Sequence, residues 1–282
     1  MMRRALCLLV AWLVAGIGLA GPAAALELVA HRGAKLHAPE NTMAAARKAV
    51  ELGATWIEVD VRRSADNEHY LMHDARVDRT TDGEGAIATM TRAEVDKLDA
   101  GRWFGPAFIG EPVPRVSTLL EWARGKARIY FDVKDADLAK LADEVRKADM
   151  AGDTFFWFGN RDTAKTFRGV APELALKINA PTKDAVAVAA RAFGAQIVEC
   201  GPQSLTPEYY AACEAAGVRI MVTALGRNRE DVYRRVMQSP AALLLLDEPD
   251  VFHTLKTGAA ASAPSSVPAA APAGRGPLGA AR

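Results

Sequence analysis

The sequence has almost no net charge. Its 282 residues carry 35 lysines and arginines against 34 aspartates and glutamates. This nearly even balance of charge gives no argument for binding nucleic acid or for a broad attraction to acidic membranes. Cysteine is scarce as well. Of the three cysteines, Cys200 and Cys213 lie in the part that we expect to fold, and the sequence leaves open whether they form a disulfide.

The N-terminal end lacks the pattern of a folded domain. Two arginines precede an apolar run over 5–20, and the small residues 23–25 offer a cleavage site. We interpret residues 1–25 as a secretory signal peptide, because the run is short for a retained membrane anchor. The mature protein is then periplasmic or secreted, without a stable membrane span.

The C-terminal end lacks large apolar side chains. Residues 258–282 are almost entirely Ala, Pro, Gly and Ser. Such a segment cannot offset its ordering entropy by burial, so we predict a disordered tail. Residues 26–257 remain, a length that suits one large domain.

Short β-branched runs alternate with amphipathic segments along this domain. The predicted strands are Leu28–Ala30, Thr55–Val61, Arg128–Val133, Thr154–Phe158, Leu174–Ile178, Gln196–Cys200, Arg219–Thr223 and Ala242–Leu246. The predicted helices are Thr42–Leu52, Val116–Arg124, Ala136–Ala148, Arg161–Arg168, Pro181–Phe193, Pro207–Ala216 and Arg229–Gln238.

Eight strands with interleaved helices predict an α/β fold, a TIM (β/α)8 barrel. A doubly wound open sheet is the alternative. The segment 75–114 contains no barrel helix–strand pair, only turns and a short predicted helix over 92–98. We interpret it as an insertion after the second strand, lying over the top of the barrel.

Polar residues gather where the first strands end, and in a TIM barrel the active site lies at those ends. The first strand ends in His31-Arg32-Gly33. The second carries Glu58 and Asp60 and is soon followed by His73. The third ends with two more charged residues, Asp132 and Lys134. The two-residue period of a strand places Glu58 with Asp60, and Asp132 with Lys134, on the inner face.

Three acids directed into one barrel mouth need compensation, and a divalent cation such as Mg²⁺ or Ca²⁺ would supply it. Arg32 and Lys134 would then be free to bind a phosphate. His31 and His73 would serve as an acid–base pair. The alternative is that these acids and bases form only a layer of salt bridges inside the barrel, with both histidines hydrogen-bonded to protein groups. We interpret His69 and His253 as surface residues.

At this point a family resemblance emerges. The motifs that carry the resemblance are His31-Arg32-Gly33, Pro39-Glu40-Asn41-Thr42, Ile57-Glu58-Val59-Asp60 and His73-Asp74. The chain resembles the glycerophosphodiester phosphodiesterase family, within the superfamily of PI-PLC-like phosphodiesterases. The similarity is dense to Asp132-x-Lys134 and looser to Asp247-x-Pro249-Asp250.

The resemblance implies hydrolysis of glycerophosphodiesters to glycerol 3-phosphate and an alcohol, with Ca²⁺ or Mg²⁺. It implies His31 and His73 as catalytic residues, Glu58, Asp60 and Asp132 as metal ligands, and Arg32 and Lys134 as substrate-binding residues. It also implies Glu40 and Asn41 as supporting residues, with Glu40 a further candidate ligand.

Two features depart from the family pattern. The third-strand acid is commonly Glu, whereas this chain has Asp132. The seventh strand has no aromatic residue over 221–226. Other readings stay open, namely a lysophospholipase D-type enzyme acting on lipid head groups, a metal-free phospholipase C and a non-catalytic binding module. We expect the partner to be a small-molecule phosphodiester substrate, and the oligomeric state is not predicted.

Overall fold

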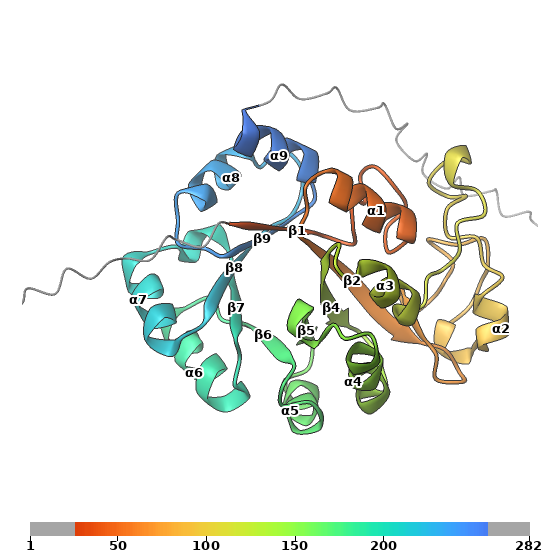
Figure 1. Cartoon of the computed structure of the whole chain (residues 1–282), viewed down its shortest axis with the longest axis horizontal. Coiled ribbons are helices and arrows are strands. Elements are labelled where there is room, and N and C mark those ends of the chain that lie inside the picture. Colours follow the sequence, from red (N-terminus) through yellow and green to blue (C-terminus); the bar gives the residue numbers. More distant parts are fainter. Residues whose placement is uncertain (1–25, 259–282) are drawn as a thin grey trace, which may run out of the picture.

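Parallel strands close into a barrel in the computed structural model, which describes residues 26–258. β1 (Glu27–Ala30) pairs with both β2 (Trp56–Arg63) and β9 (Leu243–Leu246), and this double pairing closes the sheet. Between β2 and β9, in order around the barrel, lie β4 (Arg128–Val133), β5 (Thr154–Phe158), β6 (Ala175–Asn179), β7 (Ile197–Cys200) and β8 (Arg219–Ala224). The predicted TIM barrel is confirmed, and the open sheet is excluded (Figure 1).

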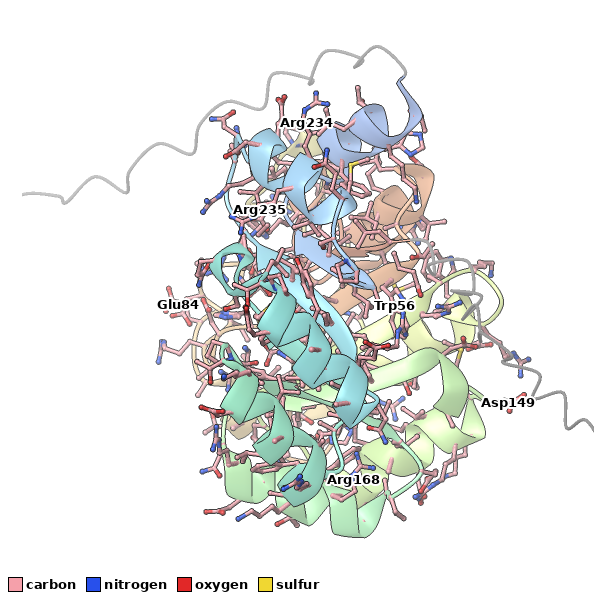
Figure 2. All side chains as sticks on the ribbon, turned by 90° about the vertical axis from the view of Figure 1, so that its left-hand side faces the viewer. Trp56, Glu84, Asp149, Arg168, Arg234 and Arg235 are labelled. Carbon is pink, nitrogen blue, oxygen red and sulfur yellow. The ribbon has the colours of Figure 1, made fainter. Side chains whose placement is uncertain are left out.

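Helices surround the barrel (Figure 1). They are α1 (Met43–Glu51), α3 (Val116–Ala123), α4 (Leu138–Lys147), α5 (Arg161–Val170), α6 (Lys183–Phe193), α7 (Pro207–Ala216), α8 (Glu230–Met237) and α9 (Pro249–Thr257). Figure 2 shows α6 and α7 side by side on the outside, with Arg234 and Arg235 on the outer surface of α8. The last helix, α9, was not predicted, although Pro249 stands at its first turn.

Side chains alternate between two cores because each strand is covered on both faces. Ile57, Val59 and Val61 of β2 pack outward beneath the helices. Trp56 points inward and meets Tyr130, Phe155 and their neighbours in a compact inner layer. This layer fills the lower barrel, so the polar residues farther along each strand stand above an apolar floor.

The chain between β2 and α3 forms a small substructure that lies beside the ring of strands and not, as the sequence had led us to expect, over the top of the barrel (Figure 1). It contains β3 (His69–Leu71), antiparallel to β2, and α2 (Arg92–Val95), with 3₁₀ turns at Ile87–Thr89 and Pro106–Phe108. Its own small core includes Tyr70, Ile87 and Val95. The structure thus places irregular chain where the sequence lacks a barrel helix–strand pair.

His69 is wrongly interpreted from the sequence as a surface residue, because it is fully buried. Its Nδ1 lies 2.8 Å from Glu144 Oε2, and its Nε2 accepts a hydrogen bond from the Asp137 backbone N–H at 3.1 Å. Pairing of β3 with β2 carries His69 under the start of α4, which local sequence does not reveal. His253 is exposed, as expected.

The structure also describes the two cysteines of the domain and the character of its helices. Cys200 and Cys213 are both buried free thiols. Over residues 26–258, every helix is too short or too polar to cross a membrane. The predicted signal peptide and all but the first residue of the predicted tail lie outside the described residues, so both stay predictions.

Candidate active site

The turn after β1 brings backbone and side chains together at the barrel mouth. Arg32 and Gly33 both have left-handed φ values, 55° and 74°. A Cβ atom at Gly33 would lie 2.8 Å from Ala45 backbone and side-chain atoms, so only glycine fits. The turn directs the Arg32 backbone N–H to Glu58 Oε2 at 2.6 Å. The cost of a non-glycine residue in this conformation, about 1–2 kcal/mol, is consistent with a functional role for the turn.

Three carboxylates from neighbouring strands converge beside this turn. Asp60 of β2 stands opposite Asp132 of β4 in the strand register, and Glu58 precedes Asp60 on the same face. One oxygen from each acid lies within 4.8 Å of the others. Asn41 fixes Asp60 by donating its amide to Oδ2 at 2.8 Å while accepting from the Asp60 backbone N–H at 3.0 Å.

The charge of this cluster is only partly compensated. Burial, and then the charges of Asp60 and Asp132, raise the pKa of Glu58 well above its usual value. Burial also raises the pKa of Asp132, against the opposing effect of Lys134. Lys134 Nζ lies 2.7 Å from Asp132 and 3.2 Å from Asp60. Arg32 Nε lies 3.2 Å from Asp60.

The expectation that a bound divalent cation would leave Arg32 and Lys134 free to bind phosphate therefore stays a prediction. Both lie against the carboxylates because the three acids stand too close together to be ionised without cations. Even so, Asp132 Oδ1 is buried and has no hydrogen-bond partner among the described residues. An all-oxygen donor set with a vacant buried acceptor fits a hard divalent cation.

His31 is held by one partner from the opposite end of the chain and one from its own loop. Its Nδ1 lies 2.8 Å from Asp247 Oδ1, just after β9, and 3.0 Å from Lys35 Nζ. Its Nε2 faces the acidic cluster, 3.9 Å from Glu58 Oε2. Burial lowers the pKa of His31, while the hydrogen bond with Asp247 acts in the opposite direction. A carboxylate on Nδ1 leaves Nε2 as the reactive nitrogen.

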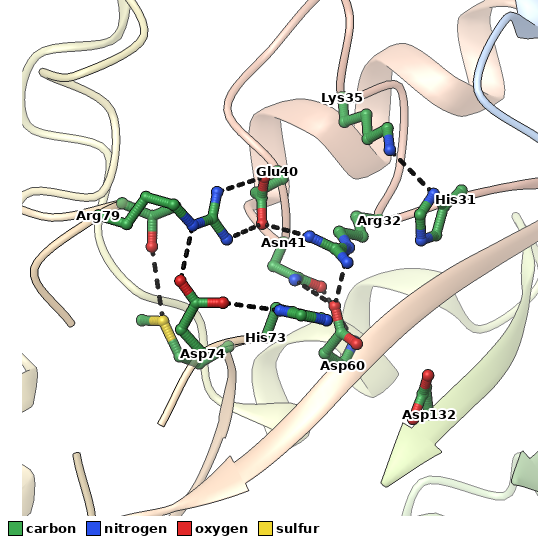
Figure 3. A network of polar contacts seen from close by, with 12 residues as sticks. His31, Arg32, Lys35, Glu40, Asn41, Asp60, His73, Asp74, Arg79 and Asp132 are labelled. Atoms are coloured by element: carbon green, nitrogen blue, oxygen red, sulfur yellow. Dashed lines mark hydrogen bonds and ion pairs between the residues drawn. The ribbon is translucent and has the colours of Figure 1, made fainter. Parts of the chain in front are cut away.

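His73 has an equivalent arrangement on the other side of the mouth. Its Nδ1 lies 2.7 Å from Asp74 Oδ1, and its backbone carbonyl accepts from Arg62 Nε at 2.8 Å. Its side chain is 34% exposed, compared with 12% for His31. Each predicted catalytic histidine therefore has one ring nitrogen on a carboxylate and the other available to a ligand. Figure 3 shows this contact for His73 and Asp74.

A chain of ion pairs connects the two sides. Arg32 Nη1 donates to Glu40 at 2.9 Å, and Arg79 donates to both oxygens of Glu40, at 2.7 and 3.0 Å. Arg79 Nε also donates to Asp74 Oδ2 at 2.6 Å (Figure 3). Glu40 thus lies between two arginines, apart from the group formed by Glu58, Asp60 and Asp132.

The structure brings together all the residues that the sequence singled out at the first three strands. It also adds Lys35, Arg79 and Asp247, which were given no role. Asp247 could have been found by extending the strand-end rule to the last strand. Lys35 and Arg79 lie in loops whose course is set by tertiary contacts, so no local signal identifies them.

A cavity of about 490 Å³ opens beside Lys134. Arg62, Trp157, Asn160 and Thr163 line it, at the carboxyl ends of β2 and β5 and the start of α5. Lys134, one of the two phosphate-binding candidates, therefore has free space next to it for the rest of a substrate.

Comparison with known proteins agrees with this geometry. Residues 31–250 match the model of the glycerophosphoryl diester phosphodiesterase family. A crystal structure of a glycerophosphodiester phosphodiesterase from Agrobacterium tumefaciens is 39% identical, with a TM-score of 0.77, over 81% of this chain and 99% of that one. A glycerophosphodiester phosphodiesterase of Caldanaerobacter subterraneus is 47% identical over 94 residues, 33% of this chain and 39% of its own length.

The curated relatives are matched over part of their length. YhdW of Bacillus subtilis is 38% identical over 145 residues, which are 51% of this chain and 59% of that protein. The family model, by contrast, spans the barrel from the end of β1 to the start of α9. This chain therefore belongs to the glycerophosphoryl diester phosphodiesterase family.

Proposed function

We propose that this chain hydrolyses glycerophosphodiesters to glycerol 3-phosphate and an alcohol, with His31 and His73 transferring protons. The observation that carries the proposal is the pairing of each histidine with its own carboxylate on either side of one charged cluster. Family membership supplies the substrate class.

We further propose that Glu58, Asp60 and Asp132 bind a divalent cation, Ca²⁺ or Mg²⁺. The vacant buried Oδ1 of Asp132 and the raised pKa of Glu58 support this assignment. A bound cation would stabilise negative charge on the phosphoryl group.

The residues of the chain itself do the rest of the proposed chemistry. Arg32 and Lys134 hold non-bridging phosphoryl oxygens through charge-assisted hydrogen bonds. Asn41 and Glu40 keep Asp60 and Arg32 in place. The Nε2 atom of one histidine takes a proton from the attacking group, either water or the glycerol 2-hydroxyl, and the other histidine gives a proton to the departing alcohol. Where the 2-hydroxyl attacks, water then opens the cyclic phosphate to give glycerol 3-phosphate. The predicted export signal leads us to infer that the enzyme works in the periplasm or outside the cell.

Glycerophosphocholine turnover by His31→Ala and His73→Ala tests the histidine assignment. We expect each variant to lose about 10²–10⁴-fold in kcat, the usual contribution of general acid–base catalysis, with an unchanged circular dichroism spectrum. His253→Ala, which alters an exposed histidine, serves as the control. Near-normal activity of either site variant would refute the assignment. EDTA should abolish turnover and added Ca²⁺ or Mg²⁺ restore it, whereas indifference to EDTA would remove the cation from the proposal.

A further inference from the structure

The wall of the barrel mouth opposite the first strands carries a second polar group. Lys177 of β6 and Glu199 of β7 point inward, since their neighbours Leu176, Ile178 and Val198 pack in the outer core. Lys177 Nζ forms an ion pair with Glu199 Oε2. The mechanism proposed above uses neither residue.

This pair belongs to a network of four side chains. The Thr223 hydroxyl of β8 donates to Glu199 Oε1. Lys177 Nζ also donates to Asn179 Oδ1 at 3.0 Å. Because an ammonium group can only donate, the Asn179 carbonyl oxygen must face Lys177, and its NH₂ group is left to donate elsewhere.

Three of the four members of the network are at least partly exposed, Thr223 among them. Lys177 is 1% exposed, but the Glu199 side chain is 16% exposed and Asn179 is exposed. Glu199 uses one acceptor site for Thr223 and one for Lys177, so its carboxylate retains further lone pairs. The cation is therefore hidden, while an acceptor, a donor and the hydroxyl of Thr223 lie toward the carboxyl ends of β6, β7 and β8.

The wall adjoins the charged cluster. The Trp157 ring lies between the two, with its centroid 5.6 Å from Lys134 Nζ and 4.6 Å from Lys177 Nζ. Tyr130 of the inner layer lies against the network, with its ring centroid 5.2 Å from Lys177 Nζ. Two strand spacings, about 10 Å, separate β4 from β6, so a short arm of a diester held at Lys134 can extend toward the wall.

We propose that Asn179, Glu199 and Thr223 form a hydroxyl-binding wall that recognises the free vicinal diol of the substrate's glycerol. Each hydroxyl of a diol both donates and accepts, which matches a carboxylate flanked by an amide donor and a hydroxyl. Acylation of one glycerol hydroxyl removes a donor and adds bulk, so the wall selects fully deacylated glycerophosphodiesters over lysophospholipids. This inference rests on the proposed function and names the feature that selects its substrate.

The kinetic test compares three substrates that differ in hydroxyls. Glycerophosphocholine has both glycerol hydroxyls free, 1-acyl-lysophosphatidylcholine has one, and bis(4-nitrophenyl) phosphate has none. For Glu199→Gln and Asn179→Ala we expect kcat/KM on glycerophosphocholine to fall about 10–100-fold, as for the loss of a hydrogen bond involving a charged group. Turnover of bis(4-nitrophenyl) phosphate should stay within about twofold of the wild-type rate, because that diester does not use the wall.

Asp162→Asn is the matched control, because it neutralises a carboxylate that is 91% exposed and apart from the mouth network. Equal losses on both diesters would overturn the proposal, since they would mean that Glu199 only neutralises Lys177. Unchanged kcat/KM on glycerophosphocholine would overturn it as well. Asn179→Ala tests the wall in a variant that should still fold, because removal of this exposed side chain leaves the Lys177–Glu199 ion pair intact.

A binding measurement separates failure of the wall from failure of the proposed function. If the wild-type chain cleaves no glycerophosphodiester, the proposed function fails. Calorimetry with sn-glycerol 3-phosphate and methyl phosphate then tests the wall by itself. The wall predicts that the wild-type chain binds sn-glycerol 3-phosphate at least about 10-fold more tightly than methyl phosphate, and that Glu199→Gln abolishes this preference. Equal affinity of the wild-type chain for the two ligands would overturn it.

Discussion

At the scale of single residues, the site depends on how its two histidines are oriented. His31 and His73 each face a carboxylate through Nδ1. A neutral imidazole carries its proton on one nitrogen only, so the carboxylate selects the tautomer in which Nε2 is free. Asp247 and Asp74 are positioning residues in this sense, because they act through the histidines.

Asp247→Asn should therefore impair catalysis more than folding. The amide can present its NH₂ group to His31 Nδ1 and so favour the wrong tautomer. We expect kcat to fall roughly 10–1,000-fold with a smaller change in KM, measured on glycerophosphocholine across pH 5–9. The control is Asp250→Asn, because the Asp250 carboxylate pairs with a different histidine, His37, at 3.3 Å. A kcat close to wild type at all pH values would show that Asp247 does not orient His31.

At the scale of elements, the segment between β2 and α3 does more than fill the gap left by a missing helix–strand pair. It delivers His73 and Asp74 directly after β3, and it supplies Arg79. Arg79 joins this segment to the loop after β1 through Glu40. The two elements that carry the histidines are thus held in one arrangement by a single guanidinium group.

Arg79→Met should loosen this connection. Because the Arg79 side chain is 46% exposed, the loss of its ion pairs should lower the free energy of unfolding by less than about 1 kcal/mol. We expect kcat to fall about 10-fold because His73 loses its fixed orientation. Arg79→Lys should recover only part of the activity, since an ammonium group cannot form the bidentate contact.

Arg76→Met provides the control for Arg79→Met. Arg76 lies in the same segment, is 63% exposed and pairs only with Asp78 among the salt bridges of the described residues. Equal kcat values for the two methionine variants would rule out a positioning role for Arg79. Full activity of Arg79→Lys would show that charge alone suffices.

At the scale of the whole molecule, several carboxylates stabilise the fold only when ionised. The Arg79 hydrogen bond, opposed by partial burial, lowers the pKa of Asp74 to about 2. Burial would raise the pKa of Asp247, but hydrogen bonds from His31 and Lys35 lower it below its usual range. Asp96 is also lowered, by Arg115 and Tyr70 against the effect of burial.

These shifts predict lower stability in acid. A carboxylate with a folded pKa below its unfolded value of about 3.9 contributes stability above that value and loses it as the pH falls toward the folded pKa. We expect the unfolding midpoint to drop by roughly 5–15 °C between pH 7 and pH 3, measured by differential scanning calorimetry. Glu58, whose pKa is raised, acts in the opposite direction and offsets part of the loss.

The Asp247→Asn variant distinguishes this cause from general acid denaturation. It should be less stable than wild type at pH 7, and the difference should shrink as the pH approaches 3. A difference that is independent of pH would contradict the linkage, because an asparagine cannot titrate.

The sequence by itself determined the barrel and the first half of the site. Alternation of apolar runs with helical patterns identified all eight barrel strands, because burial on both faces is a local demand on composition. Glu58, Asp60 and Asp132 could be placed on one inner face because a strand has a fixed two-residue period. His31 followed from the rule that strand ends meet at one mouth, and His73 was added because it comes soon after the second strand.

Only the tertiary structure decided which side chains support these residues. Barrel closure brings Asp247, 216 positions away in the chain, onto His31. Pairing of β3 with β2 buries His69, and the course of an irregular loop places Arg79 on Asp74. Asn179, Glu199 and Thr223 acquire a common wall only when β6, β7 and β8 stand side by side. These contacts join distant segments, and the periodicity of one strand or helix carries no information about its neighbour.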